Sequence, residues 1–405
     1  MPLNAVVIVG AGEAGGRAAV ELRKSGFDGR LTLIGEEAHA PYERPPLSKA
    51  VITDAAPALT TIGDGARLAE LNVERISGVV AAIDRRARLI ELVDARRLPY
   101  DALVLATGAR PRTLPLPGAE HALMLRTFED ALQIRSRILA AERVLIVGGG
   151  FIGLELAAAA RSLGRRVTLL EVDSRLLRRS TPENLAAALE ARHAGEGVEI
   201  VKDVRIERFE AVGEGVVAHS SVGAHAADVV IAGVGAAPRT ELAAAAGLVI
   251  ENGIAVDAQL RTSDPHIFAV GDCASFPHPL YPGRRLRLEA WRNAFEQGAH
   301  VAKSLLGADE AFAALPWFWS DQFDLTLQIV GLPDAGATTI GRDVGAGAAM
   351  LFHLDGDGRL VAAAGLGPIE RIGREIKLAE RLVARRASPA PAALADAGVS
   401  LKKLL

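Results

Sequence analysis

The stretch VVIVGAGEAG, from Val6 to Gly15, decides the fold of this 405-residue chain. It belongs to a continuous apolar run, Ala5 to Gly10, of the kind shown by a strand buried in a parallel sheet. A glycine-rich turn follows, and the sequence then predicts a helix over Arg17 to Lys24 and a second strand over Leu31 to Gly35. This order of elements is typical of a β-α-β unit.

The glycine turn has the spacing G-x-G-x-x-G, formed by Gly10, Gly12 and Gly15. The first glycine allows a tight turn, the second lets the backbone approach a pyrophosphate, and the third allows helix and strand to pack closely. The helix N-terminus favours the negative charge of the phosphates. An acid at the end of the second strand would accept from ribose hydroxyls, and Glu36 stands there with Glu37 beside it. These features together predict dinucleotide binding.

The same plan returns later in the chain. A strand is predicted over Arg143 to Val147, then a second glycine turn, a helix from Phe151 and a strand over Val167 to Glu171. This turn reads Gly148-Gly149-Gly150-Phe151-Ile152-Gly153. The duplication implies two nucleotide-binding domains. Two dinucleotides in one chain indicate hydride transfer, and nicotinamide and flavin are the obvious pair.

Glu171 ends the second strand of this later unit, as Glu36 does in the first. A glutamate there accepts from the ribose 2′-hydroxyl and repels a 2′-phosphate, so it favours NAD over NADP. Arg175, Arg178 and Arg179 follow closely and offer the opposite interpretation, contact with a 2′-phosphate, or simply a solvated helix start. We favour NADH.

Further strands are predicted around the two units. They cover Val79 to Asp84, Ala87 to Val93, Ala102 to Ala106, Val229 to Val234, Gly253 to Val256 and Ile267 to Val270. From about Leu315 the sequence becomes rich in aromatic residues. Stretches with the pattern of strands follow, and then a helix. These strands cover Leu325 to Val330, Ala348 to Leu354 and Leu360 to Ala364, and the helix covers Ile369 to Arg385.

The predicted fold class is therefore α/β, with two Rossmann-like dinucleotide-binding domains and a C-terminal α+β domain. The first dinucleotide-binding domain is predicted in two segments, residues 1–112 and 236–313. The second domain occupies residues 113–235, between those segments, and the C-terminal domain occupies residues 314–405.

Composition and charge exclude several classes of protein. The formal net charge of -3, from 46 Lys and Arg against 49 Asp and Glu, argues against nucleic-acid binding as the main activity. No apolar stretch approaches the ~20 residues needed to cross a bilayer, and Met1 to Asn4 lack the basic segment of a signal peptide. The single cysteine, Cys273, excludes an internal disulfide or multi-cysteine metal site, and we predict no metal. We expect a soluble protein of the cytoplasm.

The chain resembles the NADH-dependent ferredoxin reductases of bacterial oxygenase systems, the putidaredoxin-reductase and biphenyl- or toluene-dioxygenase-reductase type. This resemblance implies dinucleotide-binding domains of the glutathione-reductase type. The likeness spans essentially the whole sequence. Its first stretches are VVIVGAGEAG (Val6 to Gly15), PYERPPLSK (Pro41 to Lys49), LVLATGARPR (Leu103 to Arg112) and LRTFEDA (Leu125 to Ala131). Its later stretches are IVGGGFIGLE (Ile146 to Glu155), TSDPHIFAVGDCA (Thr262 to Ala274), LEAWRNAFEQG (Leu288 to Gly298) and PWFWSDQF (Pro316 to Phe323).

The resemblance implies that the first glycine turn binds FAD and the second binds NADH. Ala14 would contact the FAD pyrophosphate, and Glu36 would contact the adenosine ribose. Asp272, which lies beyond the carboxyl end of a buried strand, would accept from a ribityl hydroxyl. Other implied FAD contacts are Arg44, Lys49, Val80, Ala106, Arg110, Arg126 and Trp291. Implied contacts in or near the NADH domain are Gly148, Gly150, Ile152, Gly153, Glu155, Glu171 and Gly235. Outside the resemblance, an isolated Arg or Trp is more often a surface or packing residue.

Lys49 and Glu155 are the implied catalytic pair. By the resemblance they face one another beside the flavin N5, where the lysine would stabilise negative charge as flavin is reduced and the glutamate would hold the ammonium. The alternative is that Glu155 is only an acid near a helix start, where it suits the macrodipole. Hydride transfer itself needs no protein nucleophile, because the flavin carries that chemistry.

The segment Pro41 to Lys49 has no thiol, although disulfide reductases and NADH peroxidases of this fold carry cysteine near it. Cys273 is distant in sequence and is expected to pack as a small apolar residue. Electrons would therefore leave reduced flavin for an external acceptor.

The resemblance implies a [2Fe-2S] ferredoxin as that acceptor, feeding a Rieske oxygenase or a cytochrome P450. Trp317 and Trp319 would wall the flavin or, alternatively, form domain core. Candidate arginines of the docking face are Arg44, Arg110, Arg292 and Arg374. Such docking would be steered by charge and weakened by salt. Rubredoxin reductase, NADH oxidase and a redox-sensing binding module like apoptosis-inducing factor are the alternative functions.

Overall fold

The computed structural model describes residues 3–62 and 65–405, so Met1 and Pro2, where the first predicted domain segment begins, lie outside it. The chain divides into two compact units. One unit comprises Met1–Arg44, Leu59–Arg110 and Ala237–Ala314, and the other comprises Pro45–Ala58, Pro111–Ala236 and Leu315–Leu405. The short strands β8 (Ala109–Pro111) and β17 (Ala236–Pro238) lie where the chain passes between them.

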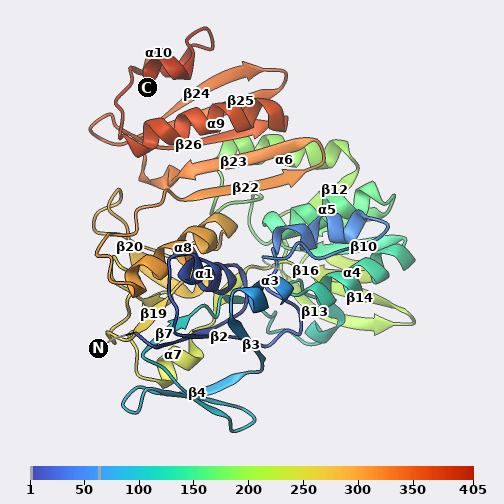
Figure 1. Ribbon diagram of the computed structural model, residues 1–405. Helices are drawn as coiled ribbons and strands as arrows, with labels where there is room; N and C mark the ends of the chain where they lie inside the picture. The colour runs from blue at the N-terminus through green and yellow to red at the C-terminus, as the bar shows by residue number, and fades with distance from the viewer. Residues whose placement is uncertain (1–2, 63–64) are drawn as a thin grey trace. The chain divides into compact units, whose positions relative to one another are not determined.

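The first unit is built on a five-stranded parallel sheet with the order β19-β7-β1-β2-β3 (Figure 1). The strands are β1 (Ala5–Val9), β2 (Arg30–Gly35), β3 (Val73–Ser77), β7 (Ala102–Leu105) and β19 (Ile267–Ala269). β1 pairs in parallel with both β2 and β7, and its residues from Val6 to Val9 are buried. The continuous apolar run of this strand is thus explained by its central place in the sheet.

Helices α1 (Glu13–Lys24) and α8 (Trp291–Leu305) pack against each other in this unit. α1 begins four residues before the predicted start at Arg17, because Gly15, the third glycine of the turn, and Gly16 belong to the helix itself. A Cβ at Gly298 of α8 would lie 2.5 Å from the Ala14 carbonyl oxygen, so the two helices touch through small residues.

The first unit also contains smaller elements. They are α3 (Gly65–Glu70), β4 (Val80–Asp84), β5 (Leu89–Leu92), β6 (Arg97–Pro99), α7 (Glu241–Ala245), β18 (Ile254–Ala255), β20 (Ala274–Pro277) and β21 (Arg285–Leu286). β4, β5 and β6 form an antiparallel sheet.

The second unit repeats the β-α-β plan in a parallel sheet of order β12-β11-β10-β16-β9. Its strands are β9 (Ala122–Leu123), β10 (Arg143–Val147), β11 (Arg166–Leu170), β12 (Val198–Val201) and β16 (Val229–Ala232). Its helices are α2 (Ala50–Thr53), α4 (Phe128–Ala140), α5 (Phe151–Ser162) and α6 (Glu183–Gly195). A separate antiparallel sheet is formed by β13 (Ile206–Val212), β14 (Gly215–Ser220) and β15 (Gly223–Ala227).

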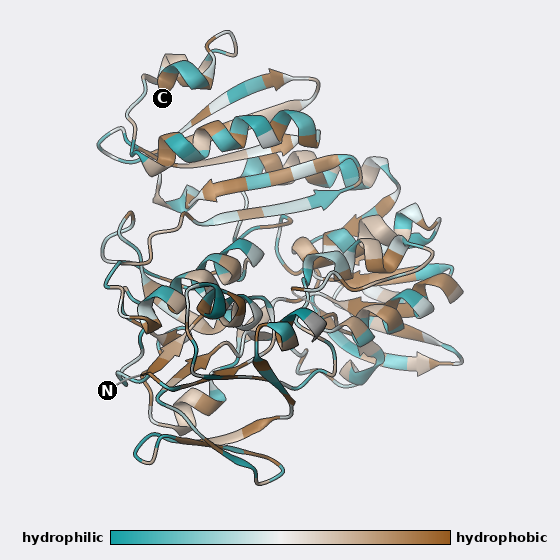
Figure 2. Cartoon of the chain, in the orientation of Figure 1, coloured by the Kyte–Doolittle hydropathy of each residue, from teal (hydrophilic) through white to brown (hydrophobic). Residues whose placement is uncertain are grey.

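The C-terminal part of the second unit is an antiparallel sheet of order β22-β23-β26-β25-β24 covered by α9 (Ile369–Ala384). Its strands are β22 (Trp317–Gln322), β23 (Leu325–Gly331), β24 (Thr338–Gly345), β25 (Ala348–Leu354) and β26 (Leu360–Gly367), followed after α9 by α10 (Pro391–Ala395). The helix is amphipathic (Figure 2), and its buried residues, such as Ile372 and Ile376, join Phe352 in one core. The predicted α/β fold class with a C-terminal α+β region is confirmed.

Within residues 3–62 and 65–405, no helix is long and apolar enough to cross a membrane.

Candidate cofactor and redox site

The first glycine turn leaves room for a ligand at one of its three glycines. Gly10 has a φ of +111°, and a Cβ on it would lie 2.1 Å from the carbonyl oxygen of Ala106. A Cβ on Gly15 would lie 1.9 Å from the oxygen of Gly10. At Gly12, by contrast, a Cβ would meet no described atom within 4 Å. The protein's own packing therefore requires glycine at the first and third positions, whereas the second position borders open space.

The second turn has the same arrangement. Gly148 has a φ of +105°, and its Cβ would lie 2.6 Å from the oxygen of Gly233, while a Cβ on Gly153 would lie 2.0 Å from the oxygen of Gly148. The nearest described atom to a Cβ on Gly150 is the Gly233 oxygen at 3.9 Å. Both turns thus fit the close approach of a pyrophosphate.

Both helices that follow these turns begin on glycine. The N-cap residues are Gly12 for α1 and Gly150 for α5, and neither provides a side-chain hydrogen bond to its helix. The first N–H groups of a helix lack partners within the helix, so they are suited to a phosphate ligand. Each turn therefore has the donor set that a dinucleotide needs.

The two acids at the ends of the second strands are in different environments. Glu36 is exposed and pairs with Arg239, with 2.6 Å between Nη1 and Oε1. Glu171 is buried and accepts from the backbone N–H groups of Gly149 at 2.5 Å and Asp173 at 2.8 Å. The carboxylate of Glu171 therefore also holds the glycine turn in shape.

Two of the arginines after Glu171 form hydrogen bonds or ion pairs within their own loop. Arg175 donates to the carbonyl oxygens of Thr181 and Arg178, and Arg178 pairs with Asp173 at 2.7 Å. These contacts favour the interpretation of Arg175 and Arg178 as loop-stabilising residues.

Glu13, inside the first glycine turn, is a feature that sequence reasoning missed. Burial raises the pKa of this carboxyl to about 7, although Arg17, 3.8 Å away, lowers it in part. A carboxyl that carries a proton part of the time adds less negative charge to a helix N-terminus suited to phosphates. The available signal was an acid between glycines at the start of a helix.

Arg44 and Asp272, predicted near the flavin, are brought together in the first unit. Burial alone would lower the pKa of the Arg44 guanidinium, but Tyr42, Glu37 and Asp272 raise it above its usual value. Arg44 Nη2 lies 2.7 Å from Oε1 of Glu37, and Oε2 of the same carboxylate accepts from the Tyr42 hydroxyl. The charge of Arg44 is therefore fixed in place.

Lys49 and Glu155 are brought together in the second unit. Lys49 Nζ lies 2.8 Å from Glu155 Oε1, and the Glu155 side chain is 4% exposed. Ser320 Oγ donates to the same oxygen at 2.5 Å, and Ser48 Oγ donates to Oε2. The alternative of a simple first-turn acid does not account for a buried carboxylate with three donors from two other segments.

The two serines were not singled out from the sequence. Ser48 lies within the PYERPPLSK stretch and Ser320 within PWFWSDQF, so their membership of these stretches was the only available signal.

The remaining predicted cofactor residues are dispersed through the two units. In the first unit, Val80 is half-buried in β4, Ala106 is buried after β7, Arg110 pairs with Glu241, and Trp291 begins α8. In the second unit, Arg126 is half-buried before α4, Ile152 is exposed on α5, and Gly235 is exposed before β17. The Trp317 and Trp319 rings stack with centroids 5.3 Å apart.

Cys273 is fully buried, and its thiol donates to the backbone oxygen of Val270. Burial raises the pKa of this thiol, so the reactive thiolate is disfavoured. The expectation that Cys273 packs as a small residue is confirmed.

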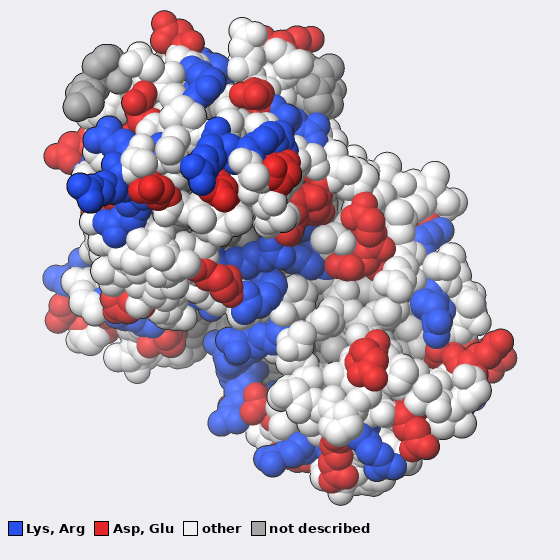
Figure 3. Space-filling model, turned by 90° about the horizontal axis from the view of Figure 1, so that it is seen from below, with Lys and Arg blue, Asp and Glu red and all other residues white. Residues whose placement is uncertain are grey.

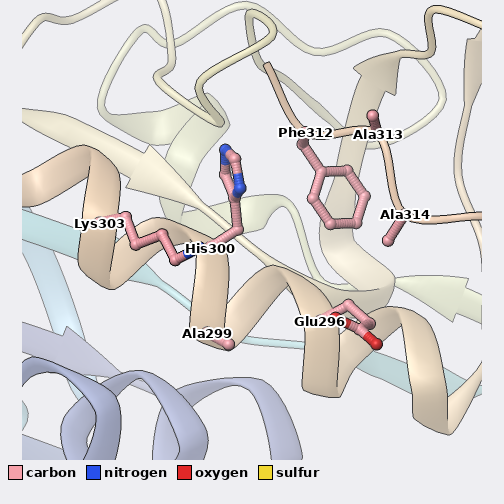
Figure 4. A pocket seen from close by; sticks show the side chains of 7 residues that line it. All are labelled: Glu296, Ala299, His300, Lys303, Phe312, Ala313 and Ala314. Carbon is pink, nitrogen blue, oxygen red and sulfur yellow. The ribbon is translucent and has the colours of Figure 1, made fainter. Parts of the chain in front are cut away.

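One pocket in the first unit does not coincide with these residues. Its lining residues come from α8 and the segment after it (Figure 4): Glu296, Ala299, His300, Lys303, Phe312, Ala313 and Ala314. None of them belongs to the predicted cofactor contacts.

Charges of both signs are interspersed on the surface in Figure 3. Of the four arginines suggested for docking, Arg44, Arg110 and Arg292 each pair with a carboxylate of their own unit. Arg374 is exposed on α9.

Comparisons with known proteins identify the family of the chain. The family "Pyridine nucleotide-disulphide oxidoreductase" matches residues 4–298, and "Reductase C-terminal" matches residues 317–405. The ferredoxin–NAD(+) reductase component of the anthranilate 1,2-dioxygenase system of Burkholderia cepacia is 44% identical over 100% of both chains.

Two solved structures are similar over nearly the whole chain. The ferredoxin reductase for the CYP199A2 system of Rhodopseudomonas palustris has a TM-score of 0.93 and 36% identity, covering 99% of each chain. The covalent putidaredoxin reductase–putidaredoxin complex gives a TM-score of 0.92 and 38% identity, covering 100% of this chain and 98% of that one. The chain therefore belongs to the pyridine nucleotide-disulphide oxidoreductase family and, within it, to the FAD- and NAD(H)-dependent ferredoxin reductases.

Proposed function

We propose that this enzyme transfers electrons from NADH, through bound FAD, to a [2Fe-2S] ferredoxin in the cytoplasm. The ferredoxin would serve a Rieske oxygenase or a cytochrome P450. The observation that carries the proposal is the pair of glycine turns, each with an uncapped helix and an open second glycine, within one chain of this family. One turn suits each of the two dinucleotides.

FAD is assigned to the first turn, in a domain of residues 1–112 and 236–313, and NADH to the second turn, in residues 113–235. Arg44 would contact the flavin, Asp272 its ribityl chain, and Glu36 the adenosine ribose. Glu171 would accept from the NADH ribose. Its carboxylate has four lone-pair sites, and two accept backbone N–H groups, so capacity for a ribose hydroxyl is left.

When bound, FAD accepts two electrons as hydride and releases them one at a time. The role of Lys49 is to hold a positive charge where negative charge develops, and Glu155 keeps the ammonium from turning into solvent.

An external acceptor is supported by the state of Cys273. This cysteine is the only one in the sequence, and it is buried with its pKa raised, so it offers no reducible disulfide and no reactive thiolate. The C-terminal domain, residues 314–405, would contribute Trp317 and Trp319 beside the flavin, and Arg374 to the docking face.

The test is anaerobic reduction of the purified flavoprotein by NADH, followed by turnover with a [2Fe-2S] ferredoxin, a rubredoxin and oxygen in parallel. We expect rapid bleaching of the flavin and the highest turnover with the ferredoxin, weakened by salt. Flavin that stays oxidised with NADH would overturn the proposal. Faster turnover with rubredoxin or oxygen would instead identify a rubredoxin reductase or an NADH oxidase.

A further inference from the structure

The carboxylate of Glu155 stands at the end of a buried chain of hydrogen bonds that reaches a second helix. Ser320 Oγ donates to it at 2.5 Å, and Gln322 Nε2 donates to Ser320 Oγ at 3.0 Å. His193 of α6 lies 2.7 Å from Gln322, between Nε2 and Oε1. Ser320, Gln322 and His193 are each at most 2% exposed.

The direction of this chain is determined by its chemistry. An amide oxygen only accepts, so His193 must carry its proton on Nε2 and donate to Gln322. That contact fixes the orientation of the amide, whose NH₂ group therefore points at Ser320 Oγ. Because Ser320 accepts from Gln322, its single O–H is directed to Glu155.

Every donor in the chain thus points toward the carboxylate. Consecutive hydrogen bonds of this kind polarise one another, and a buried carboxylate gains most from them because water does not compete. Ser48 donates to the other oxygen, so the two serines satisfy both oxygens of Glu155. Burial lowers the pKa of His193, which keeps the imidazole neutral with one N–H to donate.

The chain also crosses from one sequence segment to another. Ser320 and Gln322 lie on β22, which packs against α5, the helix that carries Glu155. The strand of the C-terminal domain therefore holds a residue of the NADH-domain helix in one orientation.

We propose that Ser320, oriented by Gln322 and His193, is a positioning residue that fixes the Glu155 carboxylate and through it the Lys49 ammonium. This inference rests on the proposed role of Lys49 beside the flavin. Without the Ser320 hydroxyl, the Glu155 carboxylate beside Lys49 loses a donor that shares its negative charge. Lys49, whose side chain is 25% exposed, also loses its fixed partner geometry. Both changes disfavour negative charge on reduced flavin.

The experiment measures the two-electron midpoint potential of bound FAD in four holoenzymes, by anaerobic equilibration with a redox dye. The proteins are wild type, Ser320→Ala, Ser320→Thr and the matched control Ser304→Ala. Ser304 is also a buried serine, but it lies on α8 and its hydroxyl donates to the His300 carbonyl oxygen. The threonine variant keeps the hydroxyl, so it separates hydrogen bonding from packing.

We expect Ser320→Ala to disfavour flavin reduction about tenfold, a shift of about 30 mV to more negative potential for a two-electron couple. Ser320→Thr and Ser304→Ala should match wild type. An unchanged potential in Ser320→Ala, or an equal shift in Ser320→Thr or Ser304→Ala, would overturn the proposal.

If Ser320→Ala does not retain FAD, Gln322→Met decides the question, because it keeps the hydroxyl and removes the N–H that orients it. A shift in the same direction supports the proposal, and an unchanged potential overturns it. The measurement uses neither NADH nor ferredoxin. A failure of the proposed function would instead appear as absent ferredoxin reduction by NADH in the wild type.

Discussion

The ammonium of Lys49 lies 2.8 Å from the carboxylate of Glu155, within a compact unit whose segments are far apart in sequence. The glutamate is almost fully buried, whereas the lysine is partly exposed. A buried carboxylate is costly unless it is paired and hydrogen-bonded, and this one has an ammonium and two hydroxyl donors. The pair therefore combines structural and electrostatic roles, which variants can separate.

Lys49→Met should slow the reduction of bound FAD by NADH at least about tenfold, because the positive charge that favours charge development is lost. The variant should also be less stable, since it leaves Glu155 buried without its cation. Adding Glu155→Gln should restore the melting temperature but not the rate. Anaerobic stopped-flow absorbance and thermal unfolding check these outcomes, and a double variant with wild-type rate would contradict the catalytic role.

Gly12→Ala should fold normally and bind FAD at least about tenfold more weakly, a loss of about 1.4 kcal/mol. The added methyl meets no described protein atom within 4 Å, but it would occupy the space that a pyrophosphate approaches. Gly15→Ala is the contrasting variant, because its methyl would lie 1.9 Å from a backbone oxygen and disturb the fold. The flavin-to-protein absorbance ratio and circular dichroism distinguish the two. Full flavin content in Gly12→Ala would refute the assignment.

Gly150→Ala should retain FAD and bind NADH at least about tenfold more weakly, since the same argument applies to the second turn. Titration of the holoenzyme with NAD⁺ or NADH measures the affinity. Loss of FAD instead of NADH affinity would show that the two assignments are reversed.

Glu13→Gln should raise the stability of the holoenzyme at pH 8 but not at pH 4. Glu13 ionises near its ordinary pKa of 4.5 in the unfolded chain, whereas burial raises its pKa to about 7 in the folded protein. The contribution of the protonated group is therefore fully present below pH 4.5 and is lost as the pH rises through 7. The shift corresponds to at most about 3 kcal/mol.

Thermal unfolding of Glu13→Gln and wild type across this pH range gives the measurement, with Glu21→Gln on the same helix as control. If the melting temperatures of the Glu13→Gln and wild-type proteins changed in parallel with pH, this would argue against a buried carboxyl with a raised pKa at Glu13.

Glu171→Gln should raise the ratio of NADPH to NADH affinity about tenfold, because the charge that repels a 2′-phosphate is removed while the side-chain oxygen still accepts. Glu171→Ala should weaken the binding of both coenzymes, since the hydrogen bonds to Gly149 and Asp173 that shape the turn are lost. Titration of both variants with NADH and NADPH provides the comparison. An unchanged ratio in Glu171→Gln would mean that Glu171 does not select the coenzyme.

Much of the fold was predictable because its signals are local. The glycine turn depends on the positive φ of Gly10 and on the close contact of Gly15 with the Gly10 oxygen, both of which a short stretch specifies. The strands from Arg143 to Val147 and from Ala348 to Leu354 were predicted with their observed bounds. By contrast, the start of α1 at Glu13 was missed, because glycines normally disfavour helix and here they serve close packing.

The sequence alone determined the family, the two dinucleotide turns and the absence of a second thiol, since each is a property of residue identity and spacing. Only the tertiary structure decided which hydroxyls serve Glu155. Ser48 and Ser320 reach it from two segments far apart in the chain, and long-range packing, not local pattern, determines such contacts. The raised pKa of Glu13 likewise follows from burial, a quantity that the assembled fold decides.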